Sequence, residues 1–287
     1  MNKKKIYTAG FAIPALLAYS IFFILPTIMS FFFSLTVWDF EGFTFCGLKN
    51  FQMFLSDSSL YSSISHTLIY ALLTSGAKLL LGFCIALFLT SYIKTKNILR
   101  AVIYFPNLVS TIAVGITFKV LMHPSRGLIN SVLEVLHLPT PDWLGDIKLA
   151  LFSVAGVDVW KGVGIATIIF IAGIESIDSS YLEAASIDGA TWWQKVRYIT
   201  LPLSASSRNS IIILSLIGGL RAFDLIWSMT GGGPGFASDV LASVIYKQYA
   251  SGYYGLSTAG NVVMLVLVAA IGFPLQKILR SKEEEIA

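Results

Sequence analysis

Long apolar runs alternate with short polar segments along the chain, and six of the runs are long enough to form membrane-spanning helices. About 20 apolar residues in a helix cover the roughly 30 Å of hydrocarbon in a bilayer. The predicted spans are residues 8–33, 67–93, 101–122, 149–174, 209–229 and 254–279. Because backbone polar groups in lipid must be satisfied within the protein, the pattern predicts an all-α polytopic membrane protein with one transmembrane domain over residues 1–287.

The polar segment between the fourth and fifth runs, residues 180–202, has the signals of two short helices. Two pairs have capping-box spacing, Ser180 with Glu183 and Thr191 with Gln194. Gly189 can adopt the left-handed conformation that ends a helix. Pro202 is expected to end the second helix, because proline disfavours helix in the residue before it. Such a well-capped element predicts a segment that another molecule holds.

Composition agrees with a membrane protein. The 287 residues are 55% hydrophobic and only 13% charged, whereas a soluble domain carries roughly 25% charged residues. The first apolar run is longer than a signal-peptide core, which predicts an uncleaved first helix. The net charge of +4 gives no indication of nucleic-acid binding. Cys46 is expected in a loop and Cys84 in an apolar helix far along the chain, so the two cysteines predict neither a disulfide framework nor a metal site.

Lysine and arginine residues predict the orientation, because they concentrate in cytoplasmic loops. One side carries Lys3, Lys4, Lys5, Lys94, Lys96, Arg100, Lys195, Arg197, Arg208, Lys277, Arg280 and Lys282. The other side carries Lys49, Arg126, Lys148 and Lys247. Both termini are therefore expected in the cytoplasm, together with the loop at 175–208.

A few charged residues fall inside the predicted spans, where they are expensive and face a partner, a cavity or a water path. Lys78 and Lys119 are two of them. Asp158 with Lys161, and Arg221 with Asp224, are spaced i,i+3 and are expected to pair along one helix face. An alternative is that such pairs only lock helices together.

Segment 180–202 resembles a hallmark of the permease subunits of bacterial ABC importers. The pattern is Glu-Ala-Ala, three residues, Gly, nine residues, Ile, one residue, Leu-Pro. Glu183-Ala184-Ala185, Gly189, Ile199 and Leu201-Pro202 match it. A second stretch, Phe223-Asp224-Leu-Ile-Trp-Ser-Met-Thr-Gly231-Gly-Gly-Pro234, resembles the carbohydrate permeases of the maltose and glycerol-phosphate type.

The resemblance implies a type I ABC importer permease in the bacterial cell membrane. It implies as partners a second homologous permease, two ATPase subunits that bind ATP and magnesium, and a solute-binding protein outside the cell. This chain would hold no cofactor or metal. The residues that would contact the ATPase are Glu183, Ala184, Ala185, Asp188 and Gly189. Local capping and helix propensity are the alternative explanation for Glu183 and the alanines.

The same resemblance implies a sugar substrate, most simply a disaccharide or oligosaccharide. Sugar sites favour aromatic stacking and hydrogen bonds, and intramembrane charges favour a polar cavity. The candidate pathway residues are Asn107, Asp158, Trp160, Arg221, Asp224, Trp227 and Asn261. Interfacial anchoring or core packing is the competing explanation for each aromatic residue.

Other functions remain as alternatives with less support. A glycerol-phosphate or polyol importer would share the same motifs. A stand-alone secondary transporter would be expected to show inverted repeats or paired broken helices, and it gives no role to segment 180–202. An enzyme needs a metal or nucleophile constellation, and the sequence contains neither that nor a Walker A phosphate loop. ATP hydrolysis is therefore expected in another chain.

Overall fold

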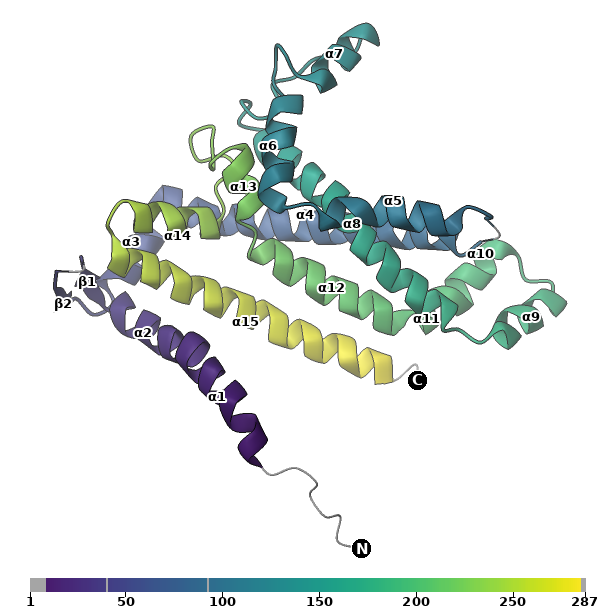
Figure 1. Ribbon diagram of the computed structural model, residues 1–287, viewed down its shortest axis with the longest axis horizontal. Coiled ribbons are helices and arrows are strands. Elements are labelled where there is room, and N and C mark those ends of the chain that lie inside the picture. Colours follow the sequence, from purple (N-terminus) through teal and green to yellow (C-terminus); the bar gives the residue numbers. More distant parts are fainter. Residues whose placement is uncertain (1–8, 40, 92, 285–287) are drawn as a thin grey trace, which may run out of the picture. The chain divides into compact units, whose positions relative to one another are not determined.

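The computed structural model describes residues 9–39, 41–91 and 93–284, which are mostly helical (Figure 1). In chain order the elements are η1 (Ala9–Ala12), α1 (Ile13–Tyr19), η2 (Ser20–Ile24), α2 (Leu25–Ser34), β1 (Thr36–Trp38), β2 (Phe43–Phe45), α3 (Lys49–Ser56), α4 (Ser58–Leu89), α5 (Lys96–Leu108), α6 (Thr111–Leu121), α7 (Leu128–Val135), α8 (Ala150–Glu175), α9 (Ser179–Ile187), α10 (Trp192–Lys195), η3 (Val196–Thr200), α11 (Leu201–Leu203), α12 (Ala205–Leu220), α13 (Asp224–Met229), α14 (Leu241–Ala250) and α15 (Tyr254–Glu284). The chain forms two compact units, Met1–Tyr61 with Ile245–Leu265 and Ser62–Val244 with Val266–Ala287.

Membrane-spanning helices account for most of the described residues. Four are long and apolar enough to cross a bilayer alone: Gly10–Ser34, Leu60–Leu89, Ala150–Glu175 and Tyr254–Ser281. Two bent pairs pass the same test, Lys96–Leu108 with Thr111–Leu121 and Trp192–Leu203 with Ala205–Leu220. The described chain thus has six crossings if each bent pair counts as one, which agrees with the six apolar runs. Residues Lys3, Lys4 and Lys5, which contribute to the predicted orientation, lie outside the described residues.

The third predicted span, 101–122, is not a straight helix. It consists of α5 and α6, which meet at an angle of 94°. The break lies at Val109 and Ser110, whose backbones are extended with ψ of 141° and 132°. The apolar pattern could not show this bend, because hydropathy records which residues avoid water and not the direction of the chain.

The fifth predicted span, 209–229, also differs from the prediction. Helix α12 ends at Leu220, and α13 begins only at Asp224. Pro202 does not end the preceding helix, since the helical run continues to Leu203 before a bend of 67°. The helix can continue through Pro202 because a π-helical turn, η3, comes just before it. In this turn the Leu201 N–H bonds the Val196 carbonyl, five residues back and not four as in an α-helix.

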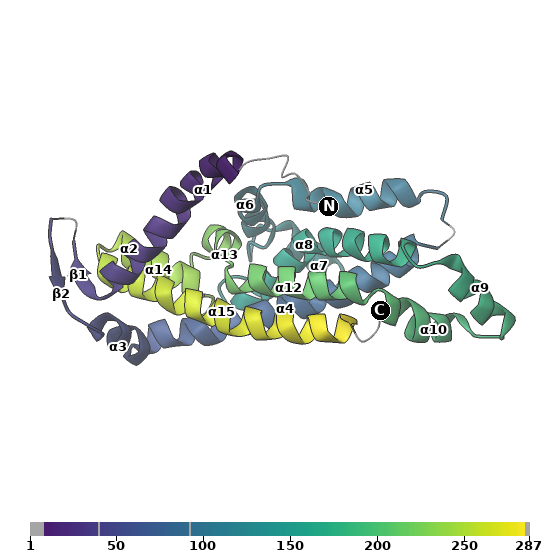
Figure 2. The same ribbon diagram turned by 90° about the horizontal axis from the view of Figure 1, so that it is seen from below.

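The first unit contains a short hairpin held by one buried amide. Strands β1 and β2 pair antiparallel, with Val37 opposite Thr44 (Figure 2). The Asn50 side chain, 6% exposed, donates to the carbonyls of Ser34 at 2.9 Å and Thr36 at 2.8 Å. Since a buried amide without partners is costly, Asn50 fixes the end of α2 and the start of β1 to α3.

Close helix packing in the second unit depends on small residues. A Cβ added at Gly82, Gly115, Gly164 or Gly219 would come too close to Ala166, Ser228, Ile103 and Ala71, respectively. These contacts join α4 to α8, α6 to α13, α5 to α8 and α12 to α4. Small residues at helix crossings let backbones approach in lipid, where no hydrophobic force drives helices together. The arrangement of α4, α5, α8 and α12 is visible in Figure 2.

Replacement of Gly164 by valine is expected to separate α5 from α8. The new Cβ would overlap the Ile103 carbonyl and lie 2.9 Å from the Tyr104 Cα, and backbone cannot move aside as a side chain can. Overpacking of this kind costs about 1–3 kcal/mol or more, so the melting temperature of the purified protein should fall clearly. Gly156→Val on the same helix is the matched control, because its Cβ meets nothing within 4 Å. Equal melting temperatures for the two variants would contradict the packing role.

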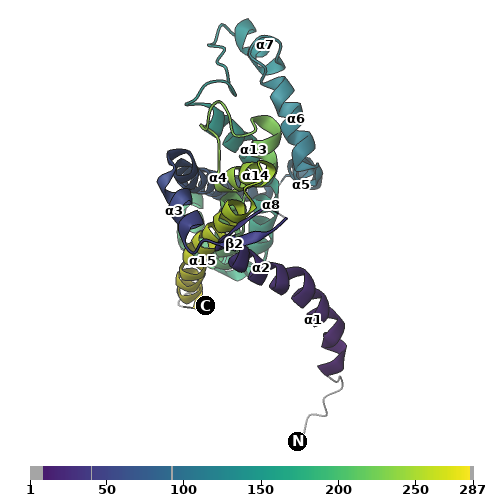
Figure 3. The same cartoon turned by 90° about the vertical axis from the view of Figure 1, so that its left-hand side faces the viewer.

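The segment after α6 is ordered by a second buried amide. Asn130 on α7 donates to the carbonyls of Pro124 and Pro141, both at 3.0 Å, and accepts a bond of 2.7 Å from the Trp143 indole. One side chain thus ties three points of residues 124–143 together. Figure 3 shows α6 and α7 following each other away from α5.

Candidate functional site

Helix α9, in the polar segment between α8 and α12, starts with a different cap from the one expected. Its N-cap is Asp178, whose side chain accepts the Ser180 N–H at 2.9 Å. The predicted box of Ser180 with Glu183 is therefore wrong. Aspartate two positions earlier starts the helix sooner, and it is at least as good a cap as serine. The hydrogen bonds from Ser180 lower the pKa of the Asp178 carboxyl below its ordinary value, so the cap is charged at neutral pH.

The turn after α9 has the geometry of a Schellman motif. The Ala190 N–H donates to the Ala185 carbonyl at 2.9 Å, and the Gly189 N–H donates to Ser186 at 3.2 Å. This pair of bonds requires a left-handed residue at its centre. Gly189 supplies it with φ of +74°, as the sequence predicts.

Helix α10 begins with the predicted capping box. The Thr191 hydroxyl accepts the Gln194 N–H at 3.4 Å, and the Gln194 side chain accepts the Thr191 N–H at 2.7 Å. The Lys195 ammonium then donates to the Ser186 hydroxyl at 2.7 Å. This bond joins α10 back to α9, so the two short helices and their turn form one ordered element, which we call the α9–α10 element (residues 178–200).

The α9–α10 element presents apolar and aromatic side chains to the surroundings. Ile187 is 88% exposed, and Tyr181, Trp192, Trp193 and Tyr198 are exposed by more than half. Of the residues predicted to contact an ATPase, Glu183, Ala184, Asp188 and Gly189 are exposed, and Ala185 is half-buried. In Figure 1 the element lies beyond the adjoining ends of α8 and α12. An ordered element with an exposed apolar surface is typical of a docking site.

An ion pair braces the base of this element. Arg100 on α5 pairs with Glu175, the last residue of α8, and the same guanidinium donates to the Leu89 carbonyl at the end of α4. The ends of α4, α5 and α8 are thereby joined near the point where the α9–α10 element begins. The α9–α10 element is thus attached close to the joined ends of three helices.

The second unit also contains a cavity of about 270 Å³, in which a few polar groups lie among mostly apolar surface. Its lining comes from α4, α5, α6, α8 and α12, and consists of Lys78, Asn107, Thr111, Asp158, Lys161, Gly162, Ile165, Ala166, Ile169, Ile211, Leu214, Ser215 and Gly218. The cavity lies at the break between α5 and α6. Polar groups that converge among apolar helices are typical of a ligand site, so we call it the α4–α8 cavity.

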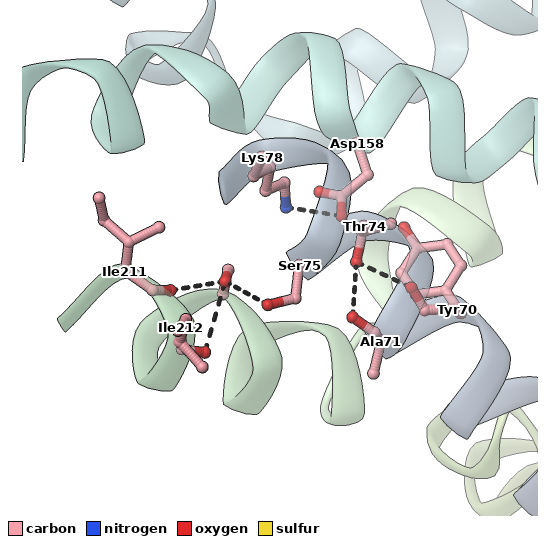
Figure 4. Close-up of polar contacts among 9 residues, drawn as sticks. Tyr70, Ala71, Thr74, Ser75, Lys78, Asp158, Ile211 and Ile212 are labelled. Atoms are coloured by element: carbon pink, nitrogen blue, oxygen red, sulfur yellow. Dashed lines mark hydrogen bonds and ion pairs between the residues drawn. The ribbon is translucent and has the colours of Figure 1, made fainter. Parts of the chain in front are cut away.

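Asp158 on α8 forms its ion pair with a residue of another helix and not with a residue of α8. Its carboxylate accepts from the Lys78 ammonium of α4 at 2.8 Å (Figure 4). The expected pairing with Lys161 is therefore wrong. Gly162 explains the outcome, because a Cβ there would lie 2.6 Å from the Lys78 Cε. The lysine side chain runs across the bare glycine to reach Asp158.

Two further polar side chains of α4, Tyr70 and Ser75, lie near this ion pair (Figure 4). The buried Tyr70 hydroxyl lies beside the Asp158 carboxylate without a hydrogen bond of good geometry (Figure 4). Ser75 bonds Ser215 of α12 at 2.7 Å through their hydroxyls. A hydroxyl pair between helices satisfies both groups away from water, which fixes the positions of α4 and α12 at the cavity.

Only two of the predicted pathway residues, Asn107 and Asp158, line the α4–α8 cavity. Trp160 is 47% exposed and contacts Phe118, and Trp227 stacks on Phe223. Asn261 lines a separate pocket of the first unit with Phe22 and Pro26.

The predicted helical pair of Arg221 and Asp224 is also corrected. Arg221 caps the end of α12, and Asp224 begins α13, so the two do not lie one turn apart on a common helix. The three-residue break between the helices removes the i,i+3 geometry. Asp224 in the first turn of α13 is instead well placed for the positive end of that helix dipole.

Sequence reasoning missed Thr111 and Ser215 as cavity residues and did not include Lys78 and Lys161 among the pathway candidates. Both lysines are visible in the sequence as charges inside apolar runs, which is the signal that could have found them. Thr111 and Ser215 carry no such signal, since threonine and serine often bond to their own helix backbone.

A family model describes most of this chain. Residues 78–284 match the family described as binding-protein-dependent transport system inner membrane component. The match includes both the α9–α10 element and the α4–α8 cavity.

Several relatives are similar over nearly their whole length. The trehalose/maltose transport system permease protein of Thermococcus litoralis is 32% identical over 95% of this chain and 93% of its own. The multiple sugar-binding transport system permease protein of Streptococcus mutans is 31% identical over 96% of this chain and 95% of its own.

Solved structures have the same fold. A chain of a bacterial ABC transporter that imports the acidic polysaccharide alginate superposes with a TM-score of 0.82 at 23% identity, covering 95% of this chain and 94% of that chain. A chain of the alginate transporter in complex with its pentasaccharide-bound periplasmic protein gives 0.84 at 22% identity, covering 96% and 94%. The family match and the relatives show the family of this chain, and the solved structures show its fold. The chain belongs to the binding-protein-dependent transport system inner membrane components, as a multi-pass permease subunit of an ABC importer and not an enzyme.

Proposed function

We propose that this permease moves a sugar, a disaccharide or oligosaccharide, from a solute-binding protein into the cytoplasm by alternating access. Support comes from two relatives at 31–32% identity, whose names state trehalose and maltose or multiple sugars. The α4–α8 cavity, which brings charged, amide and hydroxyl groups together within an apolar helical unit, is the observation in this chain that carries the proposal, because such groups line pathways for polar solutes.

The energy would come from two ATPase subunits that bind ATP and magnesium. The α9–α10 element would dock on one of them through Glu183, Ala184, Ala185, Asp188 and Gly189. Its rigidity supports the role, since two caps, a Schellman turn and the Lys195–Ser186 bond keep it ordered without a partner. Both termini would lie in the cytoplasm with the loop at 175–208, and residues 1–287 would act as one transmembrane domain.

The other half of the pathway would come from a second homologous permease. The α4–α8 cavity, with Asn107 and Asp158, would form the part supplied by this chain. Trp160, Arg221, Asp224, Trp227 and Asn261 remain proposed pathway residues that would meet the sugar at other stages or at the interface with the second permease. A glycerol-phosphate or polyol substrate has less support, because the names of these two relatives state sugars.

Purification of the tagged chain from its native membrane tests the assembly. We expect a second permease and an ATPase to be recovered with it, and expect uptake of a labelled disaccharide to require ATP and the binding protein. A stand-alone secondary transporter would be recovered without these partners and would take up sugar without ATP. That result would refute the proposed function.

A further inference from the structure

The charges that line the α4–α8 cavity do not balance. Lys78 and Lys161 each carry an ammonium, and Asp158 carries the one carboxylate among the lining residues. Asp158 is already engaged, because Lys78 lies 2.8 Å away and has a side chain only 12% exposed. The pair neutralises itself, so the positive charge of Lys161 remains.

Lys161 is held by a weak contact only. Its ammonium lies 3.5 Å from the main-chain carbonyl of Asn107, which is the outer limit for a hydrogen bond to a neutral group. Lys161 takes no part in the ion pairs Lys78–Asp158 and Arg100–Glu175. A half-buried ammonium within apolar helices is expensive unless an anion or water compensates it.

Two helix ends reach the cavity, and their partial charges oppose each other. Thr111 is the first residue of α6, at a partially positive helix N-terminus, and Asn107 lies in the last turn of α5, at a partially negative C-terminus. Asn107, Thr111 and Ser215 add amide and hydroxyl groups. Among the lining residues described, none is aromatic, so a sugar here would be held by polar contacts and charge and not by stacking.

We infer that the α4–α8 cavity is a subsite for an anionic group carried by the transported sugar, a carboxylate or a phosphate ester, with Lys161 as its counter-ion. The inference rests on the proposed function and narrows its substrate to an acidic sugar. On binding, the anionic group replaces the Asn107 carbonyl at the Lys161 ammonium, while Lys78 stays with Asp158. A neutral sugar gains no such contact.

The potential of the cavity can be measured with a reporter cysteine at Thr111. The complete importer is reconstituted in nanodiscs with Cys46 and Cys84 replaced by alanine and with Thr111→Cys. An anionic and a cationic methanethiosulfonate reagent are then compared for their rates of reaction. Since a cleft of one charge sign enriches the opposite ion on the order of tenfold or more, the anionic reagent should react several times faster.

Lys161→Met should remove this preference, and Lys148→Met is the matched control. Lys148 is exposed and does not line the cavity, so its loss should leave the rate ratio unchanged. Equal rates for the two reagents, or a ratio that Lys161→Met leaves intact, would overturn the inference.

Protection of the cysteine identifies the group that binds. Glucuronate and glucose 6-phosphate share their ring with glucose and differ from it in carrying a carboxylate or a phosphate ester. Glucose is therefore the neutral control for both compounds. We expect one or both to slow the modification at concentrations where glucose does not, and expect Lys161→Met to abolish the protection. Protection by glucose alone would contradict the subsite.

The outcomes separate this inference from the proposed function. An importer that takes up a neutral disaccharide and no acidic sugar is still a sugar importer, and only the anionic subsite fails. An importer that takes up no sugar, neutral or acidic, loses the proposed function, while the reporter still measures the charge of the cavity.

Discussion

Gly189→Val should reduce ATP-driven uptake about tenfold, while Gly189→Asn should leave it within about twofold. Gly189 has φ of +74° and open space around it, so only backbone conformation distinguishes the two variants. A left-handed conformation costs a non-glycine residue about 1–2 kcal/mol, and it is least unfavourable for asparagine and most for β-branched residues. About 1.4 kcal/mol corresponds to a factor of ten. Uptake by membranes that contain equal amounts of each importer is the measurement.

The pair of variants separates shape from size. Valine would shift the Schellman turn and change the angle between α9 and α10, so the proposed docking surface would no longer be held in one geometry. Asparagine adds a similar volume and keeps the turn. Full uptake by Gly189→Val, or equal loss in both variants, would show that ATP-driven uptake does not depend on the geometry of this turn.

The second large effect is expected at the ion pair between Lys78 and Asp158. Lys78→Met and Asp158→Leu each leave one charge without its partner inside the helical unit. Loss of one member of a buried pair costs about 3–5 kcal/mol, which we reduce to about 1–3 kcal/mol here because the side chain of Asp158 is 24% exposed. Each single variant should therefore melt several degrees lower in a thermal unfolding assay of the purified importer.

The double variant tests whether the pair is structural, functional or both. Replacing both charges removes the unpaired group, so stability should recover to near that of the original protein. Uptake should not recover, because the pathway has lost its polar groups. If the two losses of stability simply add in the double variant, Lys78 and Asp158 do not interact as described. If uptake recovers with stability, the pair only locks α4 to α8.

Local signals in the sequence predicted the α9–α10 element well. Gly189 and the Thr191–Gln194 box act within a few residues, and so their outcome is decided by the segment itself. The start of α9 was mispredicted because Asp178 and Ser180 are both good caps, and the sequence does not say which one captures the free amides. The choice depends on where α8 ends, which is decided by the packing of a long helix.

The cavity was predicted only in part, since its geometry is non-local. Lys78 on α4 and Asp158 on α8 are separated in the chain by three further helices, α5, α6 and α7. Their contact depends on the absence of a side chain at Gly162. Spacing along one helix could suggest only the wrong partner, Lys161. The bends at Ser110 and Ser204 have the same origin, because apolarity requires that a segment avoid water and leaves its direction to the helices around it.

Residue-specific photo-crosslinking tests most directly the central claim that the α9–α10 element is the contact with the ATPase. A photoreactive amino acid is placed at Ile187 on α9, 88% exposed, or at Val135 on α7, 77% exposed, in cells that produce the complete importer. We predict a crosslinked product that contains the ATPase from position 187 and none from position 135. An ATPase product from position 135 with none from position 187 would contradict both the docking role and the proposed orientation.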